Sequence, residues 1–368
     1  MTFRFIHTAD WQLGQGFDRF PPDAAAALRK ARLGVVERIG RLAAEEDMDA
    51  ILVAGDCFDQ IGVADKTLRQ FLIAAESFPG PWVLLPGNHD PALAESPWSR
   101  LRRMNAPDNI IIADRAEPVE IGSAIILPAP LQRRRDVVDL TDWFDSAATL
   151  DGHFRIGLAH GSIAEFLPEP GEALNPIAIN RAETARLDYL ALGDWHGQLK
   201  VDPRTWYSGT PETDRFKDND SGFVLKVSLQ KPGCAPQVEA VRTSAITWRR
   251  AQIEITPGDA DRFAERLSGL TAESEAVVRL VLTGVVDLAT RAEVMHVVEE
   301  AAARVLDLDL DDTGLLIEPS DDDLDAIDTA GFVRTALDDL RGRLDGPEGD
   351  TARRALAHLH RLHLEAEG

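Results

Sequence analysis

Residues 51–59 read ILVAGDCFD, an apolar run that gives way at once to glycine and two aspartates. The first four residues are typical of a buried strand, and the glycine permits the tight turn that follows it. The same pattern recurs along the first half of the chain, where apolar runs end directly in Asp, Gly, Asn or His. These runs predict buried strands at 3–7, 51–54, 82–85, 156–159 and 189–192.

Helical patterns separate the predicted strands. Residues 24–46 and 66–77 carry apolar side chains at spacings of three and four, which predicts two crossover helices. Strands that alternate with helices predict a layered α/β, or α+β, domain. Residues 206–255 then show mostly strand patterns, including 222–229 and 237–242, and we expect them to form a second sheet that closes this domain.

The chain has 368 residues, more than a typical single domain, so we expect a large domain at 1–250 and smaller modules after it. The first module, 251–322, is predicted to be a small α/β domain. Helix and strand patterns alternate within it at 259–270, 276–283, 289–305 and 315–318. The second module, 323–368, contains two helical stripes joined by a Gly- and Pro-containing turn, which predicts a helical hairpin at 328–366.

Composition limits the cellular location and the binding partners. The net charge is −23, and an acidic surface repels phosphate backbones, so the chain alone is poorly suited to bind nucleic acid non-specifically. No run approaches the roughly 20 apolar residues of a membrane span, and the first residues lack a signal-peptide pattern. Cys57 and Cys234 are too few for a disulfide framework, and we interpret both as small buried residues. These features predict a cytoplasmic protein without a membrane segment.

Five segments place metal-ligating residue types directly after predicted strands, where the loops of a layered domain gather at one edge. They are Asp10-Trp11-Gln12, Gly55–Asp59, Gly87–Asp90, Ala159–Gly161 and Gly193–His196. Each segment alone is a weak indication, because a strand-end cap explains it equally well. Together and in this order they resemble the pattern of calcineurin-like metallophosphoesterases, which runs D-x-H, GD-x-x-D, GNH-D/E, H and G-H-x-H.

This resemblance implies a four-layer β-sandwich flanked by helices and a site for two divalent metal ions. Hydrolysis of a phosphodiester requires charge neutralisation on the non-bridging oxygens and an activated water, and two ions about 3.5 to 4 Å apart supply both. The resemblance implies that the carboxylate of Asp56 bridges the ions. It assigns Asp10, Gln12 and His196 to the first ion, and Asn88, His160 and Asp194 to the second.

The same resemblance implies a catalytic role for His89, which would lie over the leaving oxygen and donate a proton or a strong hydrogen bond to it. Asp59 resembles the family's partner of this histidine, a carboxylate that orients the ring and favours its charged form. A lone histidine in a loop usually has only a structural role, but five ordered segments favour the catalytic interpretation.

Two positions depart from the family pattern. Gln12 stands where D-x-H has its histidine, and Asp194 stands where G-H-x-H begins. Oxygen therefore replaces nitrogen twice, which shifts the expected preference toward harder ions, manganese first and magnesium second, and away from zinc. Because an amide oxygen is a weak neutral ligand, we expect the first ion to bind less tightly than the second.

Further motifs narrow the resemblance. Residues 6–14, 55–59 and 86–90 are similar to the opening motifs of SbcD-type DNA repair exonucleases, and 207–212 and 222–225 resemble later parts of that family. The resemblance implies a DNA exonuclease that works with a large SbcC-like coiled-coil ATPase and can form a homodimer. It makes the predicted hairpin the candidate contact for the ATPase, with intramolecular packing as the alternative. An ATPase that binds DNA would also reconcile a DNA substrate with the acidic charge.

Five side chains are candidates for contact with DNA. Arg133, Arg134 and Arg135 follow a strand end, where they could reach a phosphate backbone. Trp11 and Trp195 each stand between two proposed metal ligands, where a base could stack on them. A solvated loop and packing between strands are the alternatives.

Three functions remain open from the sequence. The first is a DNA exonuclease subunit that depends on manganese or magnesium. The second is an enzyme that acts on small phosphodiesters such as cyclic nucleotides, which the acidic charge suits without a partner. The third is a non-catalytic assembly subunit, in which the changes at Gln12 and Asp194 have abolished one metal site.

Overall fold

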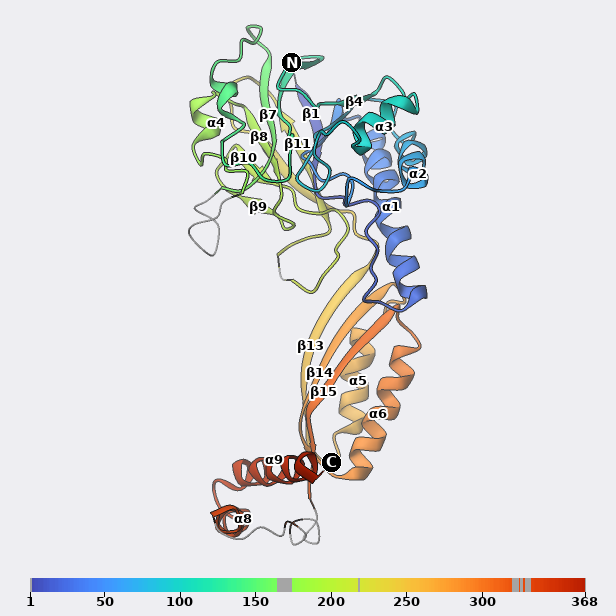
Figure 1. Ribbon diagram of the computed structural model, residues 1–368, viewed down its shortest axis with the longest axis vertical. Coiled ribbons are helices and arrows are strands. Elements are labelled where there is room, and N and C mark those ends of the chain that lie inside the picture. The colour runs from blue at the N-terminus through green and yellow to red at the C-terminus, as the bar shows by residue number, and fades with distance from the viewer. Residues whose placement is uncertain are drawn as a thin grey trace. The chain divides into compact units, whose positions relative to one another are not determined.

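The computed structural model describes residues 2–163, 174–217, 219–319, 324, 327 and 332–367. It forms two compact units, Met1–Ile246 and Thr247–Gly368 (Figure 1). The second unit begins at Thr247, whereas the sequence predicted a boundary after residue 250. Residues 328–331 of the predicted hairpin lie outside the described residues.

Two six-stranded sheets form the first unit, and we call them sheet 1 and sheet 2. Sheet 1 has the order β12-β11-β1-β2-β3-β4, and sheet 2 has the order β5-β6-β7-β8-β10-β9. The strands of sheet 1 are β1 (Phe3–Thr8), β2 (Ala50–Val53), β3 (Trp82–Leu84), β4 (Ile110–Ile112), β11 (Phe223–Leu229) and β12 (Gln237–Arg242). Those of sheet 2 are β5 (Val119–Ile121), β6 (Ala124–Ala129), β7 (Phe154–His160), β8 (Tyr189–Gly193), β9 (Leu199–Lys200) and β10 (Thr205–Tyr207). All five strands predicted from the apolar runs are confirmed.

The strands that precede the proposed ligands run parallel within each sheet. In sheet 1, β1 pairs with β2 and β2 with β3, with Ile51 opposite both Ile6 and Trp82. In sheet 2, β6, β7 and β8 pair in the same way, with Ala159 opposite both Ala129 and Leu192. Because parallel neighbours end at the same edge, the polar residues that follow these strands gather there.

Helices cover the outer face of each sheet (Figure 1). They are α1 (Pro22–Glu45), α2 (Asp65–Ala75) and α3 (Pro97–Arg103) on sheet 1, and the 3-10 helix η1 (Asp142–Asp145) and α4 (Arg181–Thr184) on sheet 2. The inner faces pack on each other, where Phe5 and Leu52 of sheet 1 share a buried cluster with Ile156 of sheet 2. Since both faces of β2 are covered, all its residues are buried and its sequence is apolar throughout. The four-layer prediction is confirmed.

The second unit contains a sheet of three parallel strands in the order β13-β14-β15. Its elements are β13 (Thr247–Ile255), α5 (Ala260–Leu270), β14 (Ala276–Val286), α6 (Leu288–Ala302) and β15 (Asp307–Ile317), followed by α8 (Phe332–Gly342) and α9 (Gly349–Glu367). Phe263 of α5, Val294 of α6 and Leu280 of β14 meet in one buried cluster, so both helices cover the same face. Leu337 of α8 and Leu356 of α9 share another cluster, as expected for a helical hairpin.

One strand prediction in this region was wrong, and another covered only the end of a longer strand. The run that ends at Ile255 was expected to close the first domain, but β13 pairs along its length with β14 instead. An apolar alternation shows that a segment is a strand and does not show which sheet it joins. The strand predicted at 315–318 is the end of β15, which begins at Asp307. Leu308 and Leu310 pack on the helices, while Asp309 between them is exposed.

The free cysteines differ in exposure. Cys57 is buried as expected, whereas Cys234 is exposed in the turn after β11, so the prediction that both are buried was wrong for Cys234. Among the described residues, every helix is too short or too polar to cross a lipid bilayer.

His7 lies fully buried between the two sheets. Its Nε2 donates to the carbonyl of Leu192 at 3.2 Å, and its Nδ1 lies 3.0 Å from the hydroxyl of Tyr189, which therefore donates to it. Because a carbonyl can only accept, the proton of the neutral ring lies on Nε2, and Nδ1 accepts from the Tyr189 hydroxyl. Burial lowers the pKa of His7 to about 3, although the bond to Leu192 opposes this shift.

We expect His7 to make folding stability fall as pH falls. The folded-state pKa is about 3 and the unfolded value is 6.5, so the unfolded chain binds the proton more readily between these values. The loss is about 1.4 kcal/mol per pH unit below 6.5, or about 2 kcal/mol between pH 6.5 and 5. The loss is measured by urea unfolding of the wild type and of His7→Gln at several pH values, both with chelator. The difference between the two pH dependences of the unfolding free energy is the contribution of His7. Equal losses in the two proteins would contradict the prediction.

Candidate metal centre

The two sheets bring the five predicted segments together. Asp10 follows β1 and its N–H donates to the carbonyl of Gly55 at 3.1 Å, while the N–H of Gln12 donates to that of Asp56 at 2.9 Å. The N–H of Asp194, after β8 of sheet 2, lies 3.2 Å from both carboxylate oxygens of Asp10. The loops after β1 and β2 are therefore bonded to each other and to the loop after β8.

Asp10, Asp56 and His160 form the buried centre of the site. One ligand atom from each lies within 4.8 Å of the others, a spacing suited to a metal ion. Nδ1 of His160 donates to the carbonyl of Ala54 at 2.8 Å, which leaves the lone pair on Nε2 in the neutral ring. That Nε2 lies 3.5 Å from Oδ1 of Asp56 and 3.3 Å from Oδ1 of Asn88. The ring is thus oriented as a ligand by a backbone bond.

Asp194 lies beside this group on the side of sheet 2. Its Oδ1 is 3.7 Å from Nε2 of His160, and its Oδ2 accepts from the hydroxyl of Ser162 at 2.7 Å. Ser162 was missed by the sequence reasoning, and only its position two residues after His160 could have indicated it. Nε2 of His160 thus lies near side-chain oxygens of Asp56, Asn88 and Asp194. These four residues are the ligands predicted for the second ion.

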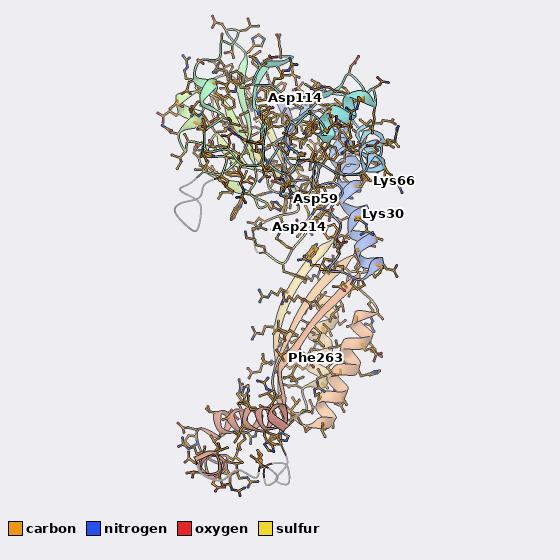
Figure 2. The ribbon with its side chains drawn as sticks, in the orientation of Figure 1. Lys30, Asp59, Lys66, Asp114, Asp214 and Phe263 are labelled. Atoms are coloured by element: carbon orange, nitrogen blue, oxygen red, sulfur yellow. The ribbon has the colours of Figure 1, made fainter. Side chains whose placement is uncertain are left out.

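Gln12 and His196 lie together on the other side. Nε2 of Gln12 is 3.3 Å from Nε2 of His196, so the two side chains predicted for the first ion meet. On its far side the ring is held by two residues that the sequence did not indicate. A guanidinium nitrogen of Arg215 lies 2.8 Å from Nδ1 of His196, and Oδ2 of Asp214 (Figure 2) lies 3.6 Å from the same nitrogen.

The charges of the site are strongly coupled. Burial raises the pKa of Asp10 to about 6, although the charges of His196 and His160 oppose the shift. Burial alone would lower the pKa of His160, but Asp56, Asp10 and Asp194 raise it to about 9. The three carboxylates of Asp10, Asp56 and Asp194 carry more negative charge than the nearby histidines can neutralise. A divalent cation bound among them would supply the missing positive charge. The donor set of carboxylates, amide oxygen and imidazole suits such ions.

Four ligand residues have backbone conformations that L-residues rarely adopt. The φ angles are 55° at Asp10, 45° at Gln12, 52° at Asp56 and 101° at Asp194. Strain of this kind costs on the order of 1 to 3 kcal/mol per residue and tends to occur at functional sites. The turns direct successive ligands toward one point.

Glycines make room for the buried ligands. A Cβ on Gly87 would lie 2.2 Å from Oδ1 of Asp56, and one on Gly55, where φ is +92°, would lie 2.2 Å from Nδ1 of His160. Any larger residue at these positions would displace a ligand. The glycines beside Asp56 and Asn88 therefore make room for the ligands.

His89 stands at the open side of the centre. Its N–H donates to Oδ1 of Asp56 at 2.9 Å, its Nε2 lies 3.9 Å from Oδ2 of Asp56, and its side chain is 43% exposed. Nδ1 of His89 lies 2.8 Å from the backbone carbonyl of Asp59 (Figure 2) and donates to it. The expected pairing with the Asp59 carboxylate was wrong in this detail, because the carbonyl takes that position. Burial raises the pKa of the Asp59 carboxyl, while nearby His89 and Arg32 lower it.

Asp90 joins two of the ligand loops. Its carboxylate accepts from the N–H of Phe58 at 2.9 Å and from that of Gly87 at 2.7 Å. Burial raises the pKa of Asp90 to about 8, and the charge of Asp56 adds to this shift. The sequence pattern contained this residue as the acidic position after His89, but its joining role required the structure.

The five candidate DNA contacts differ in their surroundings. Trp11 is fully buried, with its indole N–H on the hydroxyl of Thr8 at 2.9 Å and its ring against Phe71, so it cannot stack on a base. Trp195 is only partly buried and lies under the ammonium of Lys217. Residues 133–135, the three arginines, are exposed.

Comparisons with known proteins give a family match and several similar proteins. Residues 3–225 match the family described as calcineurin-like phosphoesterase. An uncharacterized metallophosphoesterase, YhaO, from Bacillus subtilis (strain 168) is 24% identical over 278 residues, 68% of this chain and 63% of that protein. The SbcD component of the SbcCD nuclease from the same organism is 25% identical over 297 residues, 67% of this chain and 72% of that protein. The chain thus spans less than two thirds of the length of YhaO.

Two further matches are more limited. The SbcD component of the SbcCD nuclease from Rhodobacter capsulatus is 34% identical over 113 residues, 29% of this chain and 24% of that protein. A dimetal phosphatase from Danio rerio is 12% identical, with a TM-score of 0.41 over 64% of this chain and 98% of that one. That structural likeness is too low to support a conclusion.

Proposed function

The chain belongs to the calcineurin-like phosphoesterase family, and from that premise we propose that it is a metal-dependent phosphodiesterase whose substrate is DNA. The observation that carries the proposal is the buried group of Asp10, Asp56 and His160, with His89 at its open side. Phosphoester hydrolysis needs ligands for divalent ions and a proton donor beside them, and this edge of the two sheets offers both.

The residues of the chain would divide the work as follows. The seven ligands Asp10, Gln12, Asp56, Asn88, His160, Asp194 and His196 would hold two divalent ions, which neutralise phosphate charge and activate water when bound. The carbonyl of Asp59 and the carboxylate of Asp56 orient His89 through its Nδ1 and its backbone N–H. Its Nε2 is then left to donate a proton to the leaving oxygen, provided the ring carries both protons.

Manganese is the proposed ion, with magnesium as the alternative. Three carboxylates and two amide oxygens outnumber the two imidazoles of the set, and harder ions prefer oxygen. The neutral side chain of Gln12, which faces His196, makes the first ion the weaker of the two.

Returning nitrogen to the two variant positions should shift the metal preference. The double variant Gln12→His, Asp194→His is expected to raise the ratio of bound zinc to bound manganese on the order of tenfold, because imidazole suits zinc better than an amide or carboxylate does. Metal analysis after dialysis against equimolar zinc and manganese measures the ratio. An unchanged ratio would show that these positions do not ligate the ions.

DNA is proposed as the substrate because two of the similar proteins are SbcD components of the SbcCD nuclease. By the same similarity we propose an SbcC-like ATPase as partner, with α8 and α9 as its contact, and homodimer formation. Ala357 of α9 packs on Val285 and Leu316 of its own sheet, so part of this helix is already covered, while Leu362 is 56% exposed. We also keep the cytoplasm as the proposed location, an expectation from sequence alone.

A small phosphodiester, such as a cyclic nucleotide, is the second candidate substrate. The net charge of −23 favours it, because a small ligand needs no basic surface beyond the metal centre. The third hypothesis, a non-catalytic assembly role, is disfavoured by the buried group of Asp10, Asp56 and His160 and by an oriented His89.

The test compares the two substrates directly. Wild-type protein with manganese, magnesium or chelator is incubated with end-labelled duplex DNA and with a chromogenic phosphodiester, each with and without the coiled-coil ATPase. We expect manganese-dependent cleavage of DNA that chelator abolishes. Cleavage of the chromogenic diester alone would favour the small substrate, and no cleavage of either would overturn both enzymatic proposals.

A further inference from the structure

The loop at residues 131–138, which we call the rim loop, follows β6 and reads LQRRRDVV. Its base is bonded to the segment that carries Asn88. The N–H of Leu131 donates to the carbonyl of Pro86 at 3.2 Å, and the N–H of Ala92 donates to the carbonyl of Leu131 at 2.8 Å. The rim loop therefore borders the metal centre on the side of Asn88.

The far end of the rim loop is bonded to the segment that follows another ligand. The N–H of Asp136 donates to the side chain of Asn175 at 2.8 Å, and the N–H of Asn175 returns a bond to the carbonyl of Asp136 at 2.9 Å. The carbonyl of Asn175 in turn accepts from Ser162 at 3.0 Å, the residue that holds Asp194. The loop is thus fixed at both ends to the loops that carry ligands.

The turn is held by hydrogen bonds of its own and presents two valine side chains outward. The carboxylate of Asp136 is only 5% exposed and accepts from the N–H groups of Val137 at 2.9 Å and Val138 at 3.3 Å. It also pairs with Arg133 at 3.0 Å. The side chains of the two valines are left 84% and 56% exposed, respectively, as the turn directs them to solvent.

Two positive charges of the rim loop have no ion-pair partner among the described residues. Arg134 and Arg135 are exposed and form no ion pair with any residue in the described parts of the chain. In a protein of net charge −23, such a pair beside the metal centre favours a polyanion. A small phosphodiester has a single phosphate, which the metal centre would take, so it leaves these arginines without a contact.

We propose that the rim loop holds a DNA end at the metal centre, with Arg134 and Arg135 on backbone phosphates and Val137 and Val138 against the terminal base pair. This rests on the proposed function and deepens it, because it assigns the surface that contacts the DNA beside the metal centre. Guanidinium groups bind phosphate well, and exposed apolar side chains fit the flat face of a terminal pair, which is otherwise exposed to water.

The double variant Arg134→Ala, Arg135→Ala tests the phosphate contacts. We expect kcat/KM for manganese-dependent cleavage of blunt duplex DNA to fall about tenfold, and its logarithmic dependence on salt to become shallower by nearly 2. Hydrolysis of the chromogenic phosphodiester should stay unchanged. The matched control is Arg186→Ala, Lys231→Ala, which removes two exposed cations at the opposite ends of the strands.

Each outcome decides the proposal. An equal loss in the control pair, or an unchanged salt dependence in the rim-loop pair, would overturn it while leaving DNA cleavage by the wild type intact. If the wild type cleaves only the chromogenic diester, the proposed DNA substrate fails and the rim-loop proposal fails with it.

The variant Val137→Ser, Val138→Ser tests the apolar contact separately. It removes apolar surface and no charge, so we expect a severalfold fall in kcat/KM on blunt duplex ends with the salt dependence unchanged. Cleavage of single-stranded DNA, which lacks a terminal pair, should be little affected. Equal effects on both DNA forms, or none on either, would overturn the contact with the base pair.

Discussion

Replacement of Asp56 by Asn is expected to reduce phosphodiester hydrolysis on the order of a thousandfold or more and to lower the bound metal from two ions per chain toward one or none. Oδ1 of Asp56 lies 3.5 Å from Nε2 of His160 and accepts the N–H of His89. Asparagine can still accept that bond, so the loop should stay folded. It cannot supply the negative charge that two divalent ions must share.

Two measurements decide this result: initial rates on the chromogenic diester with manganese, and metal content by elemental analysis. The same change at Asp65, whose side chain is 61% exposed on α2, is the matched control and should keep full activity and metal content. Thermal unfolding of the metal-free proteins checks that the fold survives. An Asp56→Asn protein that still binds two ions with wild-type affinity would show that another group bridges them.

Replacement of His89 by Asn should leave two ions bound and lower kcat by a factor on the order of 10² to 10⁴. Asparagine keeps a donor near the carbonyl of Asp59, as Nδ1 of His89 provides at 2.8 Å, but has nothing in place of Nε2. The loss should be largest on DNA, whose alkoxide leaving group needs a proton. It should be smaller for a chromogenic diester whose phenolate leaves readily.

The comparison of leaving groups separates a proton donor from a residue that only shapes the loop. A structural defect would lower both rates alike, whereas loss of a general acid lowers them unequally. His296→Asn, on an exposed histidine of α6, is the control and should match wild type on both substrates. Equal losses on both substrates at His89 would remove its proposed role.

Local patterns made much of this site predictable. A buried strand reads as an apolar run, and a glycine after it indicates a turn, so Asp56 and Asn88 could be placed at strand ends from the chain alone. Parallel strands end at one edge, which made their assembly into one centre an expectation. Asp10 and Asp56 have positive φ angles, which are typical of the tight turns expected where a strand ends.

Trp11 shows what local patterns leave open, because the structure confirms packing over base stacking. It stands between two ligands in the sequence, yet its ring lies in the helix layer against Phe71 and Trp82. The residues on either side have left-handed backbone conformations, so neighbours in sequence point in different directions. Asp214 and Arg215 lie against His196 in the structure, but they are distant from it in the sequence. Neither belongs to a recognisable motif, so the sequence did not indicate them.

The sequence by itself determined the order of strands and helices, the residue types available for metal binding and the two departures from the family pattern, since these depend on neighbours along the chain. Only the tertiary structure decided that β13 joins the second unit and that the Asp59 carbonyl, not its carboxylate, holds His89. It also showed that Arg134 and Arg135 are exposed and form no ion pair within the parts of the chain that the structure describes. Each of these depends on contacts between segments distant in sequence, which no local periodicity encodes.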